Sequence, residues 1–187
     1  MRRWEAIDWW IAVISPLGCL LLAVPLFAAL NHVSMRVQTG AASPTAWLDA
    51  RHQADQALAT GRFGDAIRAS NEAYAEALAS RQWLAMLEVG DLAIRIGDAT
   101  GSRTAAQTRA RECYWSALLR ARRDGALEGV LRVAEAFARL GDREIAQQAL
   151  EVAAPLAERR SPEARERYRS TVERLRIRPL TLTGVAR

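Results

Sequence analysis

The chain combines one long apolar run with a series of shorter amphipathic segments. Trp9 to Leu30 is 22 residues without a charged side chain, and a helix of that length spans roughly 33 Å, enough for the hydrocarbon core of a bilayer. Beyond residue 44, apolar positions recur at spacings of three and four, which is typical of helices with one buried face. The pattern predicts an all-α protein with a single transmembrane helix at 9–31 followed by a helical domain.

The flanks of the apolar run predict how it lies in the membrane. Amphipathic rings favour the headgroup region, and three tryptophans gather at the N-terminal end: Trp4, Trp9 and Trp10. The short flank at 1–8 carries two arginines, whereas residues 31–50 carry only Arg36. Because positive charge is retained on the cytoplasmic side, we expect a cytoplasmic N-terminus and a C-terminal domain on the outer side.

The apolar run also contains small residues and prolines. The small residues form a face suited to packing against another membrane helix: Ala12, Ser15, Gly18 and Cys19. Pro16 and Pro25 kink the span, in contact either with lipid or with a neighbouring membrane protein. Three alternatives are a cleavable signal peptide, a lipoprotein signal with Cys19 as acceptor, and a buried core helix. The length of the run argues against all three.

A 40-residue period follows a polar linker at 32–44. Gly61, Gly101 and Gly141 are spaced by 40 residues, and an alanine follows each by five. We expect a pair of antiparallel helices in each unit, because glycine ends helices by adopting the left-handed conformation. The expected units are 45–80, 82–122 and 124–160. Their helices are expected at 45–60, 64–80, 82–98, 103–122, 124–140 and 143–159.

The units resemble the tetratricopeptide repeat (TPR) family. The third unit carries the family pattern best, with Ala134, Phe137, Gly141, Asp142, Ala146, Leu150 and Ala153. The family period is 34 residues, so a period of 40 is similar to its longer-helix variety. In the second unit Gly97 precedes the repeated Gly101 by one turn, which leaves the end of that helix open. The resemblance implies an α-solenoid over 45–160.

The C-terminal region predicts one further helix. Ser161 followed by Pro162 is a good helix start, so a capping helix is expected at 161–177 and a loose tail at 178–187. Arginines cluster in this region with glutamates between them. The cluster is compatible with a solvated cap, with contact to acidic lipid or with an acidic partner.

Composition bears on the cell type and on the class of partner. The net charge is +5, and the 26 basic residues are all arginine. The absence of lysine, together with abundant alanine, is typical of a GC-rich bacterial genome, so the expected location is a bacterial inner membrane with a periplasmic domain. No aromatic–basic interleaving accompanies the arginines, and no nucleic acid is expected as a partner. Cys19 and Cys113 are not expected to form a disulfide.

The TPR resemblance implies a concave partner-binding groove lined by the first helix of each unit. The expected groove residues are Leu48, Arg51, Asp55, Leu84, Leu87, Asp91, Arg95, Leu131, Glu135 and Arg139. A carboxylate recurs among them, at Asp55, Asp91 and Glu135. These carboxylates either grip a basic or backbone-rich segment of a partner, or are neutralised within their own helices by arginines four residues away.

Nothing in the sequence predicts catalysis, a cofactor, a metal site or a small-molecule substrate. His32 and His52 are the two histidines, and neither belongs to a metal-ligand spacing. We therefore expect a membrane-anchored interaction scaffold, not an enzyme, that binds other proteins and aids assembly or stability of a bacterial envelope complex. The alternative is a stoichiometric accessory subunit of a respiratory or photosynthetic membrane complex, packed through its transmembrane helix.

Overall fold

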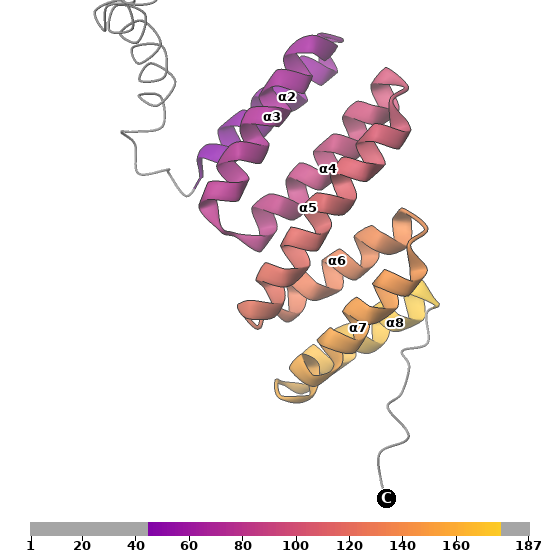
Figure 1. Ribbon diagram of the computed structural model, residues 1–187. Coiled ribbons are helices and arrows are strands. Elements are labelled where there is room, and N and C mark those ends of the chain that lie inside the picture. Colours follow the sequence, from indigo (N-terminus) through magenta and orange to yellow (C-terminus); the bar gives the residue numbers. More distant parts are fainter. Residues whose placement is uncertain (1–44, 177–187) are drawn as a thin grey trace, which may run out of the picture. The chain divides into compact units, whose positions relative to one another are not determined.

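A computed structural model describes residues 45–176, which form seven helices joined by short turns (Figure 1). The helices are α2 (Ala46–Ala59), α3 (Phe63–Ser80), α4 (Trp83–Thr100), α5 (Arg103–Arg123), α6 (Leu127–Arg139), α7 (Arg143–Glu158) and α8 (Pro162–Leu175). The expected helices of the three units and the capping helix are thereby confirmed, with ends that differ by a few residues.

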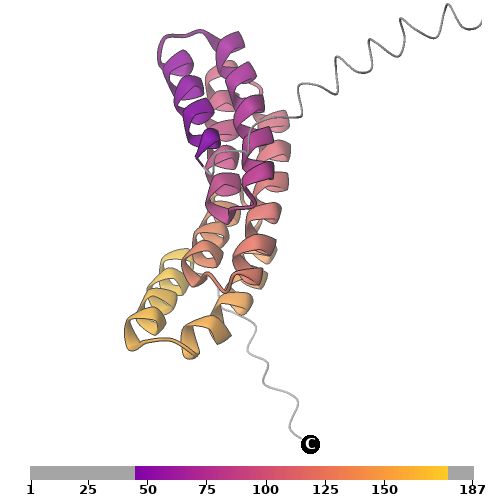
Figure 2. The same ribbon diagram turned by 90° about the vertical axis from the view of Figure 1, so that its left-hand side faces the viewer.

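Consecutive helices pack as antiparallel pairs: α2 with α3, α4 with α5, and α6 with α7 (Figures 1 and 2). Contacts also join α2 to α4, α4 to α6 and α6 to α8, so these four helices form one layer, called here the A-helix layer. The other three helices, α3, α5 and α7, form the B-helix layer. Within residues 45–176 no comparable backbone contacts join the B helices to one another. Successive pairs therefore pack mainly through the B helix of one pair and the A helix of the next, and the A helices add direct contacts with one another.

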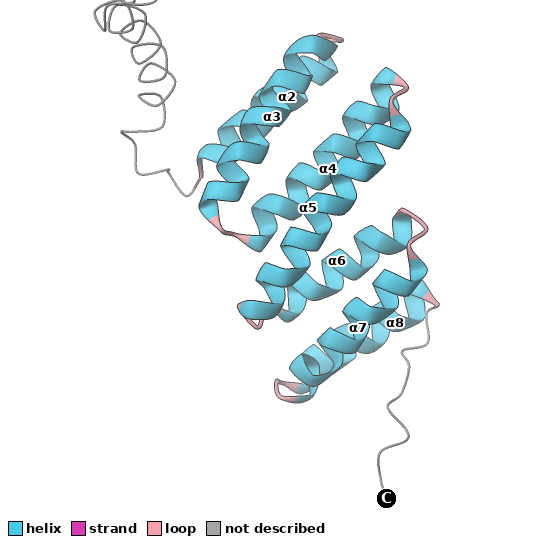
Figure 3. Ribbon diagram, viewed as in Figure 1, coloured by secondary structure: helices cyan, strands magenta, loops and turns pink. Residues whose placement is uncertain are grey.

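The described part contains helices and turns only, with no strand between residues 45 and 176 (Figure 3). Four turns contain a glycine in the left-handed region: Gly61 (φ 71°), Gly101 (φ 74°), Gly125 (φ 61°) and Gly141 (φ 85°). Helix α4 continues through Gly97 and ends before Gly101. Gly97 is inside the helix because its backbone packs against Ala106 of α5, where a Cβ would clash.

Small residues allow neighbouring helices to approach closely, both within a pair and between pairs. A Cβ added at Gly90 of α4 would lie 2.5 Å from Cε1 of Tyr114 on α5, and one at Gly129 of α6 would lie 2.7 Å from Cδ2 of Trp83. Larger rings fill the space that remains. Tyr114 packs edge-on against Phe137 with the ring centroids 5.7 Å apart. The core therefore has glycine and alanine where helices approach closely, and aromatic and larger aliphatic side chains elsewhere.

Arginines of α5 join the repeats on the B-helix side. The guanidinium of Arg109 lies 3.6 Å from the centre of the Tyr74 ring on α3. Arg120 donates to the carbonyl group of Ala77 in the last turn of α3 at 2.9 Å, and to that of Gln82, which directly precedes α4, at 3.1 Å. Arg120 therefore links α5 to the last turn of α3 and to the start of α4.

Several sequence predictions lie outside the described residues. They are the transmembrane helix at 9–31, the interface tryptophans Trp4, Trp9 and Trp10, the packing face of Ala12, Ser15, Gly18 and Cys19, the linker at 32–44 and the tail at 178–187. Of the helices between residues 45 and 176, none has both the length and the apolar character needed to cross a membrane.

Candidate functional site

The exposed face of the A-helix layer contains the charged residues that the sequence assigned to a groove. Arg51, Asp55, Asp91 and Glu135 are half-buried, and Arg95 and Arg139 are exposed. The four apolar residues assigned to the groove are more buried than the charged ones. Leu48 and Leu84 are partly buried and pack against the core. Leu87 and Leu131 are 1% and 4% exposed and belong to the core itself, which corrects their placement in the groove.

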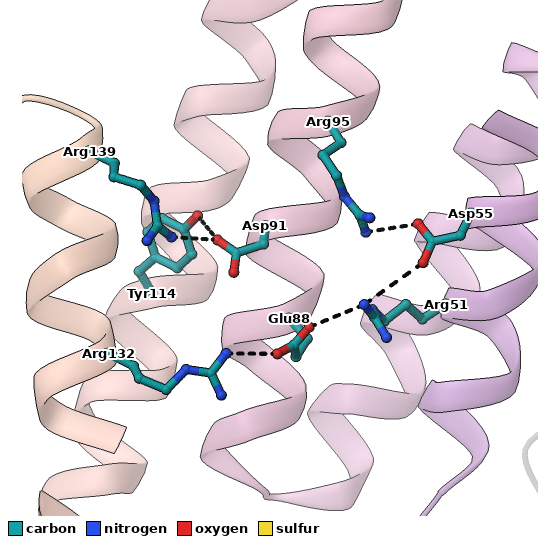
Figure 4. A network of polar contacts seen from close by, with 8 residues as sticks. All are labelled: Arg51, Asp55, Glu88, Asp91, Arg95, Tyr114, Arg132 and Arg139. Carbon is teal, nitrogen blue, oxygen red and sulfur yellow. Dashed lines mark hydrogen bonds and ion pairs between the residues drawn. The ribbon is translucent and has the colours of Figure 1, made fainter. Parts of the chain in front are cut away.

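Ion pairs connect each A helix to the next, and Figure 4 shows those between α2 and α4 and between α4 and α6. Asp55 Oδ1 lies 2.8 Å from Arg95 Nη2, Asp91 Oδ1 lies 3.0 Å from Arg139 Nη2, and Glu135 Oε1 lies 2.7 Å from Arg174 Nη1. In every case the carboxylate belongs to one A helix and the guanidinium to the following one. We call this series the inter-helix ladder.

The inter-helix ladder differs from the pairing expected within each helix. Only Arg51 and Asp55 pair at four residues, at 3.9 Å, while Arg95 and Arg139 reach back to the preceding helix. Packed helices lie roughly 8–10 Å apart, a gap that an arginine side chain can cross. The predictions of Asp91–Arg95 and Glu135–Arg139 pairs were therefore wrong, because stacking brings the next helix within reach.

Glu88 on α4 is a further member of this face that was not singled out in the sequence. Its carboxylate lies 3.4 Å from Arg51 on α2 and 2.8 Å from Arg132 on α6, so it bridges three A helices (Figure 4). Glu88 precedes Asp91 by three residues, which places both on one side of α4. This spacing of three residues from Asp91 was the feature of the sequence that could have identified Glu88 as part of the face.

Asp91 also connects the A-helix face to the core. The hydroxyl of Tyr114 on α5 donates to Asp91 Oδ1 at 2.7 Å, and Tyr114 is 2% exposed. Burial and the neighbouring carboxylate both raise the pKa of Tyr114, so the hydroxyl keeps its proton and remains a donor. Asp91 is therefore held from two sides, by a buried phenol and by an exposed guanidinium.

The inter-helix ladder lacks one charged residue at each end, and we call these two places its blank positions. Its arginines on α4 and α6 follow a ladder carboxylate by four residues. On α2 the residue four after Asp55 is Ala59, and on α8 the residue four before Arg174 is Ser170. Helix α2 therefore contributes a carboxylate without a matching arginine, and α8 contributes an arginine without a matching carboxylate.

A hollow of about 540 Å³ lies between α6 and α8 on this face. Its charged lining is largely paired already, because Glu135 binds Arg174 and Arg167 lies 3.6 Å from Glu128. An incoming charged ligand would have to displace these pairs. The hollow is therefore a poor site for a small ionic substrate.

Comparison of the chain with protein families, curated proteins and solved structures found no match.

The side chains of residues 45–176 provide little reactive chemistry. No group of three or more His, Cys, Asp or Glu residues in this part is placed to hold a metal ion. His52 is exposed on α2. Cys113 is buried, and burial raises the pKa of its thiol to about 12, so the nucleophilic thiolate is not formed at neutral pH. The arrangement is suited to presenting a surface.

Proposed function

We propose that the chain is a membrane-tethered helical-repeat scaffold of the TPR type that binds other proteins. In this proposal it aids the assembly or stability of a bacterial envelope complex. The observation that carries the proposal is the stack of helix pairs joined through the A-helix layer by the inter-helix ladder. Stacked helical repeats provide extended surfaces for protein recognition.

The ion pairs between repeats support a scaffold because they favour one fixed arrangement of the stack. A preorganised surface loses less conformational entropy when a partner binds. The same pairs leave few free charges on the A-helix face. Catalysis requires charged or nucleophilic groups that are free to react with a substrate. A surface whose charges are already paired is therefore better suited to holding proteins.

The apolar run from Trp9 to Leu30 supports the tether. A tether to the inner membrane would keep the helical domain close to membrane-bound partners and raise their effective concentration without new contacts. The prolines and small residues of that run favour the alternative, an accessory subunit packed through its span. The scaffold and the accessory subunit are proposals for the same chain. The experiment must therefore separate partner contacts made by the helical domain from those made by the membrane span.

The test is purification of the full chain from its native membrane in mild detergent, with quantitative mass spectrometry of the co-purifying proteins. The matched control replaces residues 9–31 by an unrelated transmembrane helix of the same length. Retention of the partners by the control supports the scaffold. Loss of the partners, with constant stoichiometry in the native chain, supports the accessory subunit instead. Absence of any specific partner would refute both.

Topology is tested by a reporter enzyme fused after Arg187. We expect the fusion to be active in the periplasm, on the basis of the arginines near the N-terminus. Activity confined to the cytoplasm would contradict this placement of the domain.

A further inference from the structure

An open apolar groove lies on the other side of the molecule, between α5 and α7 of the B-helix layer. Its volume is about 650 Å³, and its apolar lining consists of Trp115, Leu118, Leu119, Val152, Pro155 and Leu156. Three polar residues complete the lining: Arg122, Gln148 and Glu151. The two B helices α5 and α7 thus form a groove that is lined mainly by apolar side chains.

The groove contains the most exposed of the large apolar side chains in the described part. Leu119 is 61% exposed and Trp115 is 39% exposed. The Trp115 ring packs edge-on against Phe137, with centroids 5.5 Å apart, so the core holds it in position. A fixed, half-exposed tryptophan beside an exposed leucine is the type of anchor that dominates protein interfaces.

The groove lining contains one cation, Arg122, and one carboxylate, Glu151, which already has an interaction of its own. Two neighbouring arginines are engaged: Arg120 binds carbonyl groups in the last turn of α3, and Arg123 pairs with Asp124 at 2.9 Å. The Arg122 guanidinium, which lines the groove, has no ion-pair or hydrogen-bond partner among residues 45–176. A carboxylate on the occupant would complement it.

The two faces of the molecule differ in what binding would require. On the A-helix face a ligand must compete with pairs such as Asp91–Arg139 and Glu135–Arg174. In the groove between α5 and α7 it would cover exposed apolar surface and neutralise one cation. Arg122, the cation that such a ligand would neutralise, has no ion pair within residues 45–176 to be displaced.

We propose that this groove binds an amphipathic helical segment of a partner protein, with its apolar side on Trp115 and Leu119 and a carboxylate against Arg122. The proposal rests on the scaffold function and assigns it a surface. It places recognition on the B-helix layer, whereas the TPR resemblance implied the A-helix face. A helix fits because it presents apolar residues at spacings of three and four along one side.

The test uses two labelled synthetic peptides of about 14 residues, which is roughly four helical turns. One has a leucine face flanked by glutamates, and the other has lysine in place of each glutamate. Binding to the full chain in nanodiscs of zwitterionic lipid is followed by fluorescence anisotropy. We expect the glutamate peptide to bind about tenfold more tightly, the change that one favourable charge contact of about 1.4 kcal/mol produces.

Substitutions in the groove sharpen this test. Leu119→Asp should weaken the glutamate peptide at least about tenfold, and Arg122→Glu should reverse the preference so that the lysine peptide binds more tightly. Ile67→Asp is the matched control, because Ile67 is 46% exposed on α3 and does not line the groove. It should leave binding unchanged. Circular dichroism of each variant verifies that the helices remain folded.

Other outcomes overturn the proposal. Equal binding of the two peptides, or binding insensitive to Leu119→Asp, would show that the groove is not the site. A concentration-dependent dimer that Leu119→Asp dissociates would assign the groove to a second copy of the chain. If native partners co-purify equally with Leu119→Asp and with Ile67→Asp, the groove proposal fails while the scaffold function stands.

Discussion

Glu135 on α6 pairs with Arg174 on α8 at 2.7 Å, although Arg139 lies one turn further along its own helix. Arg139 in turn pairs with Asp91 on α4. The charges of the A-helix face therefore stabilise the stacking of helices more than any single helix, and this has consequences that can be measured.

Reversing one charge at the end of the stack should loosen α8. Arg174→Glu places two carboxylates together and should destabilise the docking of α8 by about 1 kcal/mol, the usual range for a partly exposed pair. The double variant Glu135→Arg with Arg174→Glu should recover part of that loss. Hydrogen exchange of the α8 amides measures the loss in the single variant and the recovery in the double variant. A double variant no more protected than the single one would show that the pair contributes nothing.

Asp91 should matter more than an exposed aspartate on the same helix. Asp91→Asn removes the charge that Tyr114 and Arg139 share, so we expect the free energy of unfolding to fall by about 1–3 kcal/mol. Asp98→Asn is the control, because the side chain of Asp98 is 54% exposed and pairs only with Arg103. Its effect should stay below about 0.5 kcal/mol. Urea unfolding compares the two variants, and equal losses would contradict the special role of Asp91.

Two glycine substitutions should act in opposite directions. Gly129→Ala brings a methyl group within 2.8 Å of the Ala121 Cβ and 2.7 Å of Trp83, and should cost about 1–3 kcal/mol. Gly64→Ala meets no atom within 4 Å and should stabilise the protein by roughly 0.5–1 kcal/mol, because alanine favours a helix more than glycine does. Thermal unfolding measures both changes: the Gly129 variant tests the packing of α6 against α4 and α5, and the Gly64 variant is the control without a new contact.

The buried thiol of Cys113 predicts a loss of stability at high pH. Its pKa is raised to about 12 in the folded chain, so below the ordinary thiol pKa both folded and unfolded states are protonated and stability is complete. Between pH 9 and 12 the unfolded state releases the proton first, which lowers the free energy of unfolding by about 1.4 kcal/mol per pH unit.

Cys113→Ala isolates this contribution, since alanine occupies the corresponding positions Ala73 and Ala153 of the other units. Urea unfolding from pH 8 to 11 should show a shallower decline for this variant than for the native chain. Parallel declines would mean that Cys113 does not titrate in this way.

The sequence predicted the helices well because their apolar spacing is a local property. The end of α4 was left open between Gly97 and Gly101, since the decisive fact is the approach of Ala106 from another helix. Likewise, spacing along one helix showed that Arg139 can reach Glu135, but not that Asp91 of the preceding helix is the partner it binds.

The sequence contained one indication of the groove between α5 and α7 that the sequence analysis did not use. Trp115, Leu118 and Leu119 give α5 more apolar positions than one buried face requires, because Leu118 is already in the core. Which of them stays exposed depends on how α7 packs beside α5. Local patterning does not contain that information.

The blank positions Ala59 and Ser170 have a consequence for the length of the assembly. If a second copy stacked end to end, α8 of one molecule would precede α2 of the next. The ladder would then need a carboxylate on α8, which has Ser170 at that position, and an arginine on α2, which has Ala59. Such a junction would lack the ion pair that joins every internal step. The inter-helix ladder thus stabilises the stack inside one molecule and gives no support to a head-to-tail contact between molecules.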